Sequence, residues 1–350
     1  MGCLFSREQR QETQTNATEE EPKKYSWDKR EKLDPKDYTI EKLSGETVGR
    51  IPGTVKGQQF IIRDNENCNI YIFDHSATIQ VDDCKNCKIF MGPVKTSVFV
   101  RDCENCQIAV SCQQFRTRDC RKLDVFLHCI TQPIIEASTG VKMACFQYSY
   151  PELEEQLKSA GLSIYNNSWS TVHDFTPVPG ENNFSLLPED VKIEEFLPIP
   201  TTEQFSCMKI DTNPGNSVVP VTHGSRRKPA TESCLAVFFN DGNSVNRVKQ
   251  FISEMRTKQP GCVLIQTKEV NMQAAEAVRV FGSEAYNTVV QQGPVIGLEY
   301  NGEDCVKHCK EIVASISQGS SEMVFVTQSP ELAAEQVENF YNYADMQMAV

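Results

Sequence analysis

Asp83-Cys84-Lys85-Asn86-Cys87-Lys88-Ile89 is the middle copy of a pattern that occurs three times without gaps. The copy before it is Asp64-Asn65-Glu66-Asn67-Cys68-Asn69-Ile70, and the copy after it is Asp102-Cys103-Glu104-Asn105-Cys106-Gln107-Ile108. Successive copies begin 19 residues apart, and a degenerate fourth copy, Asp119-Cys120-Arg121-Lys122-Leu123, follows after 17. A fixed period near 20 residues is typical of a solenoid, in which each repeat forms one coil.

The segments between the copies are short and β-rich, as in Ile70–Phe73, Ala77–Val81, Val98–Val100 and Val125–Leu127. Short strands joined by sharp corners predict a right-handed parallel β-helix, which we place at residues 35–200. Asn at a fixed corner position can stack into a ladder from coil to coil. The small, apolar Cys side chain suits the tight turn beside it.

The cysteines also allow a zinc interpretation. Cys84, Cys87, Cys103 and Cys106 have the spacing of a four-thiolate site, Cys-x₂-Cys-x₁₅-Cys-x₂-Cys. However, the first copy has Asn65 where the later copies have Cys84 and Cys103, and a zinc ligand does not tolerate that exchange. The repeat therefore favours reduced, structural thiols and predicts no metal and no cofactor of the protein's own.

Composition excludes some functions. The chain has 350 residues, 15 cysteines and a formal net charge of −12, so binding to nucleic acid through the phosphate backbone is not expected. The sequence contains no run of 18 apolar residues, so no membrane-spanning helix is predicted. Because no secretory signal precedes the many cysteines, we expect a reducing compartment.

The N-terminus predicts a lipid anchor. Gly2 followed by Ser6 fits the pattern for N-myristoylation, and Cys3 beside it is a candidate for palmitoylation. One myristoyl chain binds membranes with an association constant of only about 10⁴ M⁻¹, so stable anchoring needs a second signal. Residues 1–33 contain seven basic and seven acidic residues, so Cys3 is the only visible second anchor. We interpret residues 1–34 as an acylated, polar tether whose partner is a membrane.

The run Ser111-Cys112-Gln113-Gln114-Phe115-Arg116-Thr117-Arg118 lies where the repeat changes. It resembles the signature of the tubulin-binding cofactor C family, and the resemblance extends over about residues 35–200. The resemblance implies a β-helix with GTPase-activating activity, toward tubulin in one branch and toward Arf-like small GTPases in the membrane-anchored branch. It implies a GTP-bound Arf-like partner that itself holds GTP and Mg, a role in trafficking lipidated proteins, and a place at the cytoplasmic face of the plasma membrane, the cilium or the basal body.

Arg116 is the candidate arginine finger, because a fixed guanidinium stabilises charge on the β- and γ-phosphate oxygens during hydrolysis. Gln113 is the candidate that orients the attacking water or a switch residue of the GTPase. Stacking by 19 residues predicts Ser97 below Arg116 and Thr96 below Phe115, so the predicted nucleotide-facing residues are Thr96, Ser97, Gln114 and Phe115.

Three further residues are candidates for binding the partner. Arg118 lies two residues beyond Arg116 and should share its strand face. The resemblance adds Glu136 and Phe175. Each of these assignments has a competing interpretation. Arg116 could be a solvated arginine, Glu136 a solvated acid and Phe175 a core aromatic.

A second domain is predicted at residues 231–350, after a proline-rich linker at 201–230. Strands at 235–239, 262–267 and 295–300 alternate with helices at 245–255, 274–281 and 305–316, which indicates an α/β sandwich. The strand that contains Gly293-Pro294-Val295 resembles nucleoside diphosphate kinases. That family uses a strand-end histidine as nucleophile, but the corresponding stretch 323–329 has none. The domain is therefore predicted to lack kinase activity.

Two functions remain open on the sequence. The leading hypothesis is a membrane-anchored GTPase-activating protein for an Arf-like GTPase. The alternative is a noncatalytic effector or scaffold that binds the GTP form and unloads lipidated cargo. Measurement of GTP hydrolysis distinguishes them, and nucleotide kinase activity is a third, weaker hypothesis.

Overall fold

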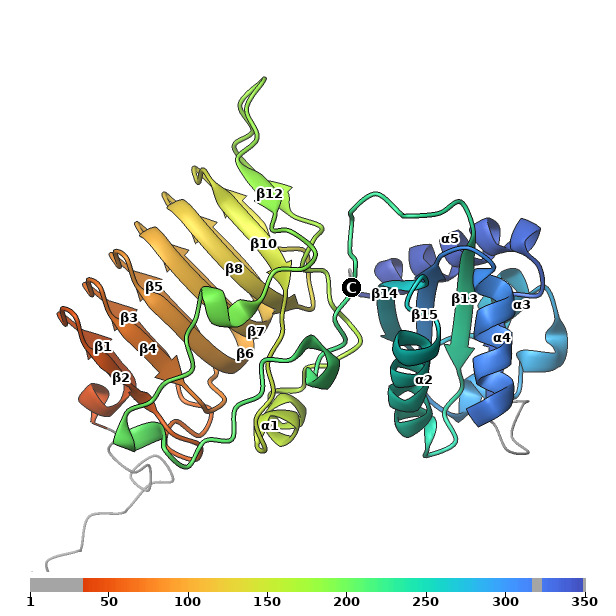
Figure 1. Cartoon of the computed structure of the whole chain (residues 1–350), viewed down its shortest axis with the longest axis horizontal. Coiled ribbons are helices and arrows are strands. Elements are labelled where there is room, and N and C mark those ends of the chain that lie inside the picture. Colours follow the sequence, from red (N-terminus) through yellow and green to blue (C-terminus); the bar gives the residue numbers. More distant parts are fainter. Residues whose placement is uncertain (1–33, 317–322, 349–350) are drawn as a thin grey trace, which may run out of the picture. The chain divides into compact units, whose positions relative to one another are not determined.

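The computed structural model describes residues 34–316 and 323–348, and residues 38–350 belong to one compact unit. The predicted lipidation sites Gly2 and Cys3 lie outside the described residues. Twelve strands form the first sheet (Figure 1). They are β1 (Thr39–Glu41), β2 (Thr47–Arg50), β3 (Phe60–Arg63), β4 (Asn69–Ile72), β5 (Ile79–Asp82), β6 (Lys88–Arg101), β7 (Glu104–Arg118), β8 (Arg121–Cys129), β9 (Ile134–Glu136), β10 (Val141–Cys145), β11 (His173–Asp174) and β12 (Phe184–Leu186).

All pairings in this sheet are parallel, and they form two columns of strands. One column contains β1, β3, β5, the second halves of β6 and β7, then β9 and β11. The other contains β2, β4, the first halves of β6 and β7, then β8, β10 and β12. Because β6 and β7 continue from one column into the other, each forms most of a coil by itself. This is the parallel β-helix that the repeat predicted.

The corners explain the repeated Asp and Asn. Asp64, Asp83, Asp102 and Asp119 have φ between 52° and 54°, and Asn67, Asn86 and Asn105 have φ of 53° to 54°. Asp and Asn tolerate this left-handed conformation better than most residues, so two of them three positions apart set each corner. The predicted Asn ladder is present where the Asn105 amide donates to Asn86 Oδ1 at 2.8 Å.

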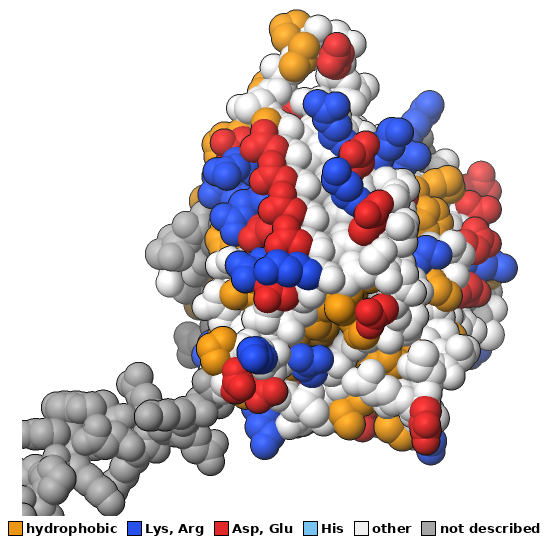
Figure 2. All heavy atoms as spheres, turned by 90° about the vertical axis from the view of Figure 1, so that its left-hand side faces the viewer, with side chains coloured by type: hydrophobic (Ala, Val, Ile, Leu, Met, Phe, Trp, Pro, Cys, Tyr) orange, Lys and Arg blue, Asp and Glu red, His pale blue; other side chains and the backbone are white. Residues whose placement is uncertain are grey.

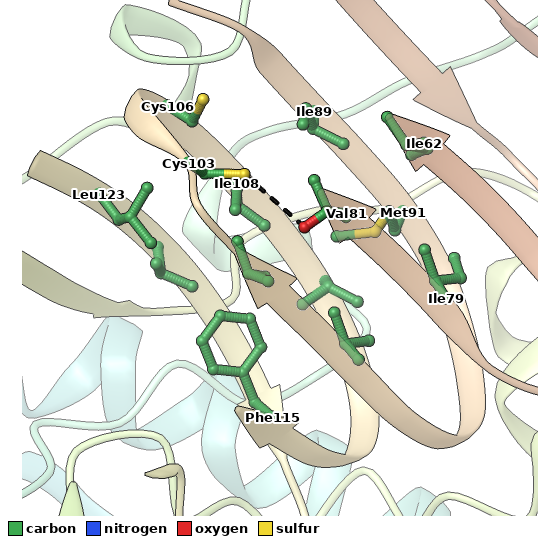
Figure 3. Close-up of a cluster of buried hydrophobic side chains, with 14 of the residues drawn as sticks. Ile62, Ile79, Val81, Ile89, Met91, Cys103, Cys106, Ile108, Phe115 and Leu123 are labelled. Atoms are coloured by element: carbon green, nitrogen blue, oxygen red, sulfur yellow. Dashed lines mark hydrogen bonds between the residues drawn. The ribbon is translucent and has the colours of Figure 1, made fainter. Parts of the chain in front are cut away.

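The interior of the solenoid is apolar and contains the repeated cysteines. Cys84, Cys87, Cys103 and Cys106 are free and buried. They pack with the inward Ile, Val, Met and Phe side chains of neighbouring coils (Figure 3). The thiols donate to main-chain carbonyls: Cys103 Sγ lies 3.2 Å from Arg101 O and 3.6 Å from Val81 O. Stacking thus places each thiol against the backbone of the coil below.

A second apolar cluster covers one outer face of the solenoid. It contains Tyr71, Phe73, Phe90 and Tyr148, with rings 4.3–6.5 Å apart. Helix α1 (Leu153–Ala160) and the 3-10 helices η3 (Ile193–Glu195), η4 (Glu203–Phe205) and η5 (Pro214–Asn216) lie in the segments that follow. Phe205 of η4 is buried in the same cluster, so the predicted linker at 201–230 packs on folded structure.

The second sheet has the order β14-β15-β13-β16 and is antiparallel in every pairing. Its elements are β13 (Ser233–Phe238), α2 (Ser244–Lys258), β14 (Val263–Val270), α3 (Ala274–Phe281), the 3-10 helices η6 (Glu284–Tyr286) and η7 (Val289–Gln292), β15 (Val295–Asn301), α4 (Cys305–Ile316), β16 (Val324–Val326) and α5 (Pro330–Met348).

Both faces of this sheet are covered. Ala236 and Phe238 of β13 pack with α2 and α4, whereas Leu235 and Val237 pack with α3 and α5. Alternation along a strand sends neighbouring side chains to opposite faces. This explains why β13 is buried throughout and apolar after Ser233, and it confirms the predicted α/β sandwich.

The segment that follows the solenoid strands is hydrogen-bonded to strand β14. Thr267 Oγ1 donates to Tyr165 O at 2.7 Å, and the backbone N–H of His223 donates to Leu264 O at 2.8 Å. The Tyr165 ring packs in the same cluster as the residues of α2 and α4. Within residues 34–316 and 323–348, no helix is long and apolar enough to cross a membrane.

Candidate functional site

Strand β7 carries the predicted finger. Its second half alternates strictly: Arg116 and Arg118 face outward, whereas Phe115 and Thr117 are fully buried. Phe115 packs in the solenoid interior. The prediction that Phe115 faces the nucleotide is therefore wrong, because its neighbour Arg116 takes the outward position and strand geometry sends the two to opposite sides.

The coil below Arg116 is also shifted from the prediction. β6 and β7 keep a spacing of 19 at Met91↔Val110 but pair Ser97 with Gln114 and Phe99 with Arg116, a spacing of 17. Irregularities between Met91 and Pro93 and between Val94 and Ser97 cause the change. Phe99, not Ser97, therefore lies directly below the finger.

Arg116 lines a hollow of about 330 Å³, which we call the Arg116 hollow, together with Phe99, Arg101, Arg118 and Glu136. Arg116 Nη2 lies 4.0 Å from Glu136 Oε2, and both side chains are 39% exposed. The Arg116 guanidinium carbon lies 5.6 Å from the centre of the Phe175 ring, in the geometry of a cation–π contact. The predicted residues Arg116, Arg118, Glu136 and Phe175 therefore come together.

Phe175 reaches Arg116 from a separate segment. It directly follows β11, which pairs with β9, and its N–H donates to Ile135 O at 2.9 Å. The ring is 52% exposed and meets the His173 ring edge to face at 4.7 Å. The Asp174 carboxylate accepts from Thr176 N–H at 2.9 Å and from the Asn183 amide at 2.8 Å, which fixes the turn after Phe175.

Sequence reasoning missed Phe99 and Arg101, the two partly exposed β6 residues that line the Arg116 hollow. Arg101 is held by two hydrogen bonds to Asp82, each 2.8 Å long, and hydrogen bonding to Asp82 raises the pKa of its guanidinium. Arg101 pairs in register with Arg118, so the hollow contains three arginines and one acid. A spacing of 17 rather than 19 was the signal that would have found both residues.

The remaining predicted residues lie on two strands: Gln113 and Gln114 precede Arg116 on β7, whereas Thr96 and Ser97 lie on the neighbouring strand β6. Gln114 accepts a hydrogen bond from Ser97 Oγ at 3.0 Å, and Gln113 O accepts from the backbone and hydroxyl of Thr131 at 3.1 and 3.0 Å. The Thr96 hydroxyl donates to Ala77 O at 2.7 Å. Gln113, Gln114, Ser97 and Thr96 do not line the Arg116 hollow, although a single strand connects the glutamines to Arg116.

Charge on the solenoid surface follows the repeat. The face in Figure 2 carries a run of acidic side chains with Lys and Arg beside it. The repeat also places Asp64, Asp83, Asp102 and Asp119 at equivalent corners of successive coils. Ion pairs also connect neighbouring coils, as between Arg63 and Glu41 at 2.6 Å. The arginines of the Arg116 hollow follow the same mixture, because Arg101 pairs with Asp82 at 2.8 Å and Arg118 with Asp119 at 3.4 Å.

The thiols have no metal-like arrangement. Among the described residues, no group of three or more His, Cys, Asp or Glu side chains has a geometry that could hold a metal ion. Cys87 and Cys106 instead donate to backbone oxygens, Cys106 at 3.4 Å to Cys84 O. Metal analysis of the purified protein remains the test of the zinc alternative.

Comparisons with known proteins now define the class. The sequence pattern of the family "Tubulin binding cofactor C" matches residues 57–175, the part that contains the Arg116 strand. Tubulin-specific chaperone C of Homo sapiens is 33% identical over 42% of this chain and 44% of its own. The fold and the motif are thus those of a tubulin-binding cofactor C domain, and the predicted resemblance is confirmed.

The whole chain has closer relatives. Protein XRP2 of Homo sapiens is 54% identical and covers 100% of both chains, and Protein XRP2 of Danio rerio is 53% identical over 96% of this chain and 89% of its own. The chain therefore belongs to the XRP2 family. A solved structure, Tubulin Binding Cofactor C from Leishmania major, covers 39% of this chain and 94% of its own at 22% identity and a TM-score of 0.33. The fold assignment rests on the strand pairing described above and not on that likeness.

Proposed function

We propose that this protein is a GTPase-activating protein for an Arf-like small GTPase and that Arg116 is its arginine finger. The observation that carries the proposal is the Arg116 hollow. It places an outward guanidinium on a rigid strand, beside two further arginines that have acidic partners of their own, Asp82 for Arg101 and Asp119 for Arg118. The solenoid supports this strand by parallel pairing on both sides, to β6 below and to β9 above.

The chemistry requires a cation at a fixed position. The partner holds GTP and Mg, and charge on the β- and γ-phosphate oxygens grows during hydrolysis. A finger supplied in trans raises the rate by about 10³–10⁵. Small displacements of such a group are costly, so a stiff scaffold is an advantage. Gln113, three residues before Arg116 on the same strand, is the candidate that orients the attacking water or a switch residue.

The contacts that hold Arg116 are weak enough to exchange. An exposed ion pair is worth about 0.2–1 kcal/mol, and an exposed cation–π contact about 0.5–1 kcal/mol. A phosphate oxygen therefore competes successfully with Glu136 for the guanidinium. Glu136 and Phe175 hold the side chain ready before the partner binds, and we assign both, with Arg118, to the interface with the GTPase.

The proposal includes a membrane anchor. Myristate on Gly2 and palmitate on Cys3 supply the two chains that stable binding needs. We place the protein at the cytoplasmic face of the plasma membrane, the cilium or the basal body, where it would support trafficking of lipidated proteins. Replacing Gly2 with Ala should release the full-length protein from membranes, and persistent binding of that variant would contradict the anchor.

The second domain is proposed to lack phosphoryl transfer. Its single histidine, His308, lies in α4, with Nδ1 3.7 Å from Glu311. No histidine follows β16, where the kinase family has its nucleophile. Exchange of phosphate between nucleoside triphosphates and diphosphates by the purified protein would overturn this part of the proposal.

Single-turnover GTP hydrolysis tests the proposed activity. Each member of a panel of Arf-like GTPases is loaded with GTP and mixed with this protein in excess. We expect at least one member to hydrolyse GTP about 10³-fold faster or more. Tight binding to the GTP form without acceleration of any member would support the noncatalytic effector instead.

A further inference from the structure

A second cavity, of about 230 Å³, lies away from the Arg116 hollow and beside helix α2. We call it the α2 cavity. Its wall combines the end of the solenoid with the second sheet. Cys145 and Gln147 come from β10 and the residues after it, Ile252 and Arg256 from α2, and Leu264 and Tyr300 from β14 and β15. Cavities between packed substructures are frequent sites of small-molecule binding.

The α2 cavity contains a buried polar group without a partner. Gln147 is 3% exposed, and its side-chain oxygen Oε1 has no hydrogen-bond partner. Buried polar atoms are nearly always hydrogen-bonded, so an orphaned amide oxygen on a cavity wall requires an explanation. A ligand that donates an O–H or N–H to Gln147 Oε1 provides one.

A neighbouring cavity repeats this pattern. It has a volume of about 320 Å³ and shares Ile252 and Arg256 with the α2 cavity. Its wall includes Tyr165, which is 2% exposed and whose hydroxyl also has no partner. The two cavities therefore share one stretch of α2, and each has one unsatisfied buried polar atom on its wall.

Arg256 is the cation common to both cavities. Its neighbours are already engaged: Arg226 donates to His223 O and Leu187 O at 2.8 and 2.6 Å, and Lys249 pairs with Glu154 at 3.0 Å. Among the residues that the structure describes, no carboxylate forms an ion pair with Arg256, and Glu189, the carboxylate that lines the α2 cavity, pairs with His223 Nδ1 at 2.8 Å. Its guanidinium is thus available to an anionic ligand.

We propose that the α2 cavity binds a small organic carboxylate that also carries a hydroxyl or amide hydrogen. The carboxylate pairs with Arg256, the hydrogen is donated to Gln147 Oε1, and the carbon body packs on Val221, Ile252 and Leu264. Charge-assisted hydrogen bonds are the stronger contacts in this set, so Arg256 dominates affinity. The proposal is independent of the GTPase reaction.

The probe is 4-hydroxybenzoate, titrated into the full chain and followed by ligand-observed NMR. We expect saturable binding. Benzoate, which lacks the donor, and 4-hydroxybenzyl alcohol, which lacks the anion, should each bind more weakly. Equal affinity for all three compounds, or no saturable binding of 4-hydroxybenzoate, would overturn the proposal.

Variants locate the site. Arg256→Gln should weaken binding about tenfold or more, because a charge-assisted contact is lost. Lys258→Gln is the matched control, since it makes the same charge change on the same helix but lines neither cavity. Gln147→Leu should weaken binding without destabilising the fold, because it removes an orphaned polar atom. Unchanged affinity in both Arg256→Gln and Gln147→Leu would contradict the site. Urea titrations of both variants check that they are folded.

Discussion

Replacing Phe175 with Ala tests how the finger is held. The Phe175 ring lies 5.6 Å from the Arg116 guanidinium carbon and is 52% exposed. A cation–π contact at an exposed site contributes about 0.5–1 kcal/mol. If the contact orients Arg116 for hydrolysis, its loss should slow the stimulated rate about two- to fivefold. Because half of the ring is already in solvent, the free energy of unfolding should change by less than about 1 kcal/mol.

The assay is single-turnover GTP hydrolysis at saturating concentrations of this protein, so that weaker binding does not affect the rate. Phe175→Tyr keeps an aromatic face and should retain the rate, whereas Phe175→Leu should not. The dissociation constant for the GTP form is measured in parallel. It reports any direct contact of the ring with the partner.

A double-mutant cycle decides whether the ring acts through Arg116. In an Arg116→Ala background, Phe175→Ala should have no further effect on the rate. An equal slowing of hydrolysis in both backgrounds would contradict an action of Phe175 through Arg116. The ring would then act on the partner independently of the finger.

Three further predictions concern the scaffold. Phe115→Ala should lower the free energy of unfolding by about 3–5 kcal/mol, whereas Phe99→Ala should lower it clearly less. Equal losses in urea titrations would contradict the assignment of Phe115 to the interior and of Phe99 to the surface. Cys103→Ala should lower the free energy of unfolding by about 1–2 kcal/mol, because one small buried group is lost. Metal analysis that finds about one zinc per wild-type chain would instead support the zinc site. Burial lowers the pKa of His128 to about 4. The neutral ring donates from Nε2 to Ser163 O at 3.1 Å, so Nδ1 accepts from the Ser111 hydroxyl at 2.6 Å. A depressed folded-state pKa gives stability that is present above pH 6.5 and lost toward pH 4. The wild type should therefore lose about 3 kcal/mol more than His128→Gln over that window, and parallel pH profiles would contradict it.

The repeat predicted the solenoid because it encodes the corners directly. Asp and Asn recur where the backbone turns into the left-handed region, and Cys recurs where space is small. The α/β sandwich was equally visible. The 12-residue helix Cys305–Ile316 has the predicted bounds, and β13 is apolar because both of its faces are covered. In each case, one local requirement fixes one residue type.

The details of the site were less visible for a physical reason. Two irregularities in β6 change the spacing between coils from 19 to 17, and the stacking prediction extended the 19-residue period past the point where the spacing changes. The prediction therefore placed Ser97 below the finger instead of Phe99, and it overlooked Arg101. Phe115 was assigned outward because its neighbours in the motif are functional, although alternation along a strand required the opposite.

Arg116 is proposed to accelerate GTP hydrolysis as an arginine finger, and not mainly to bind the GTPase. The decisive measurement is single-turnover GTP hydrolysis by the stimulated Arf-like GTPase with Arg116→Ala, alongside its affinity for the GTP form. Arg63→Ala serves as the control, because it removes an outward arginine from another coil that is paired with Glu41. We predict that Arg116→Ala lowers the stimulated rate about 10³-fold or more while GTP-dependent binding persists and Arg63→Ala keeps the full rate. An unchanged rate with Arg116→Ala would contradict the account.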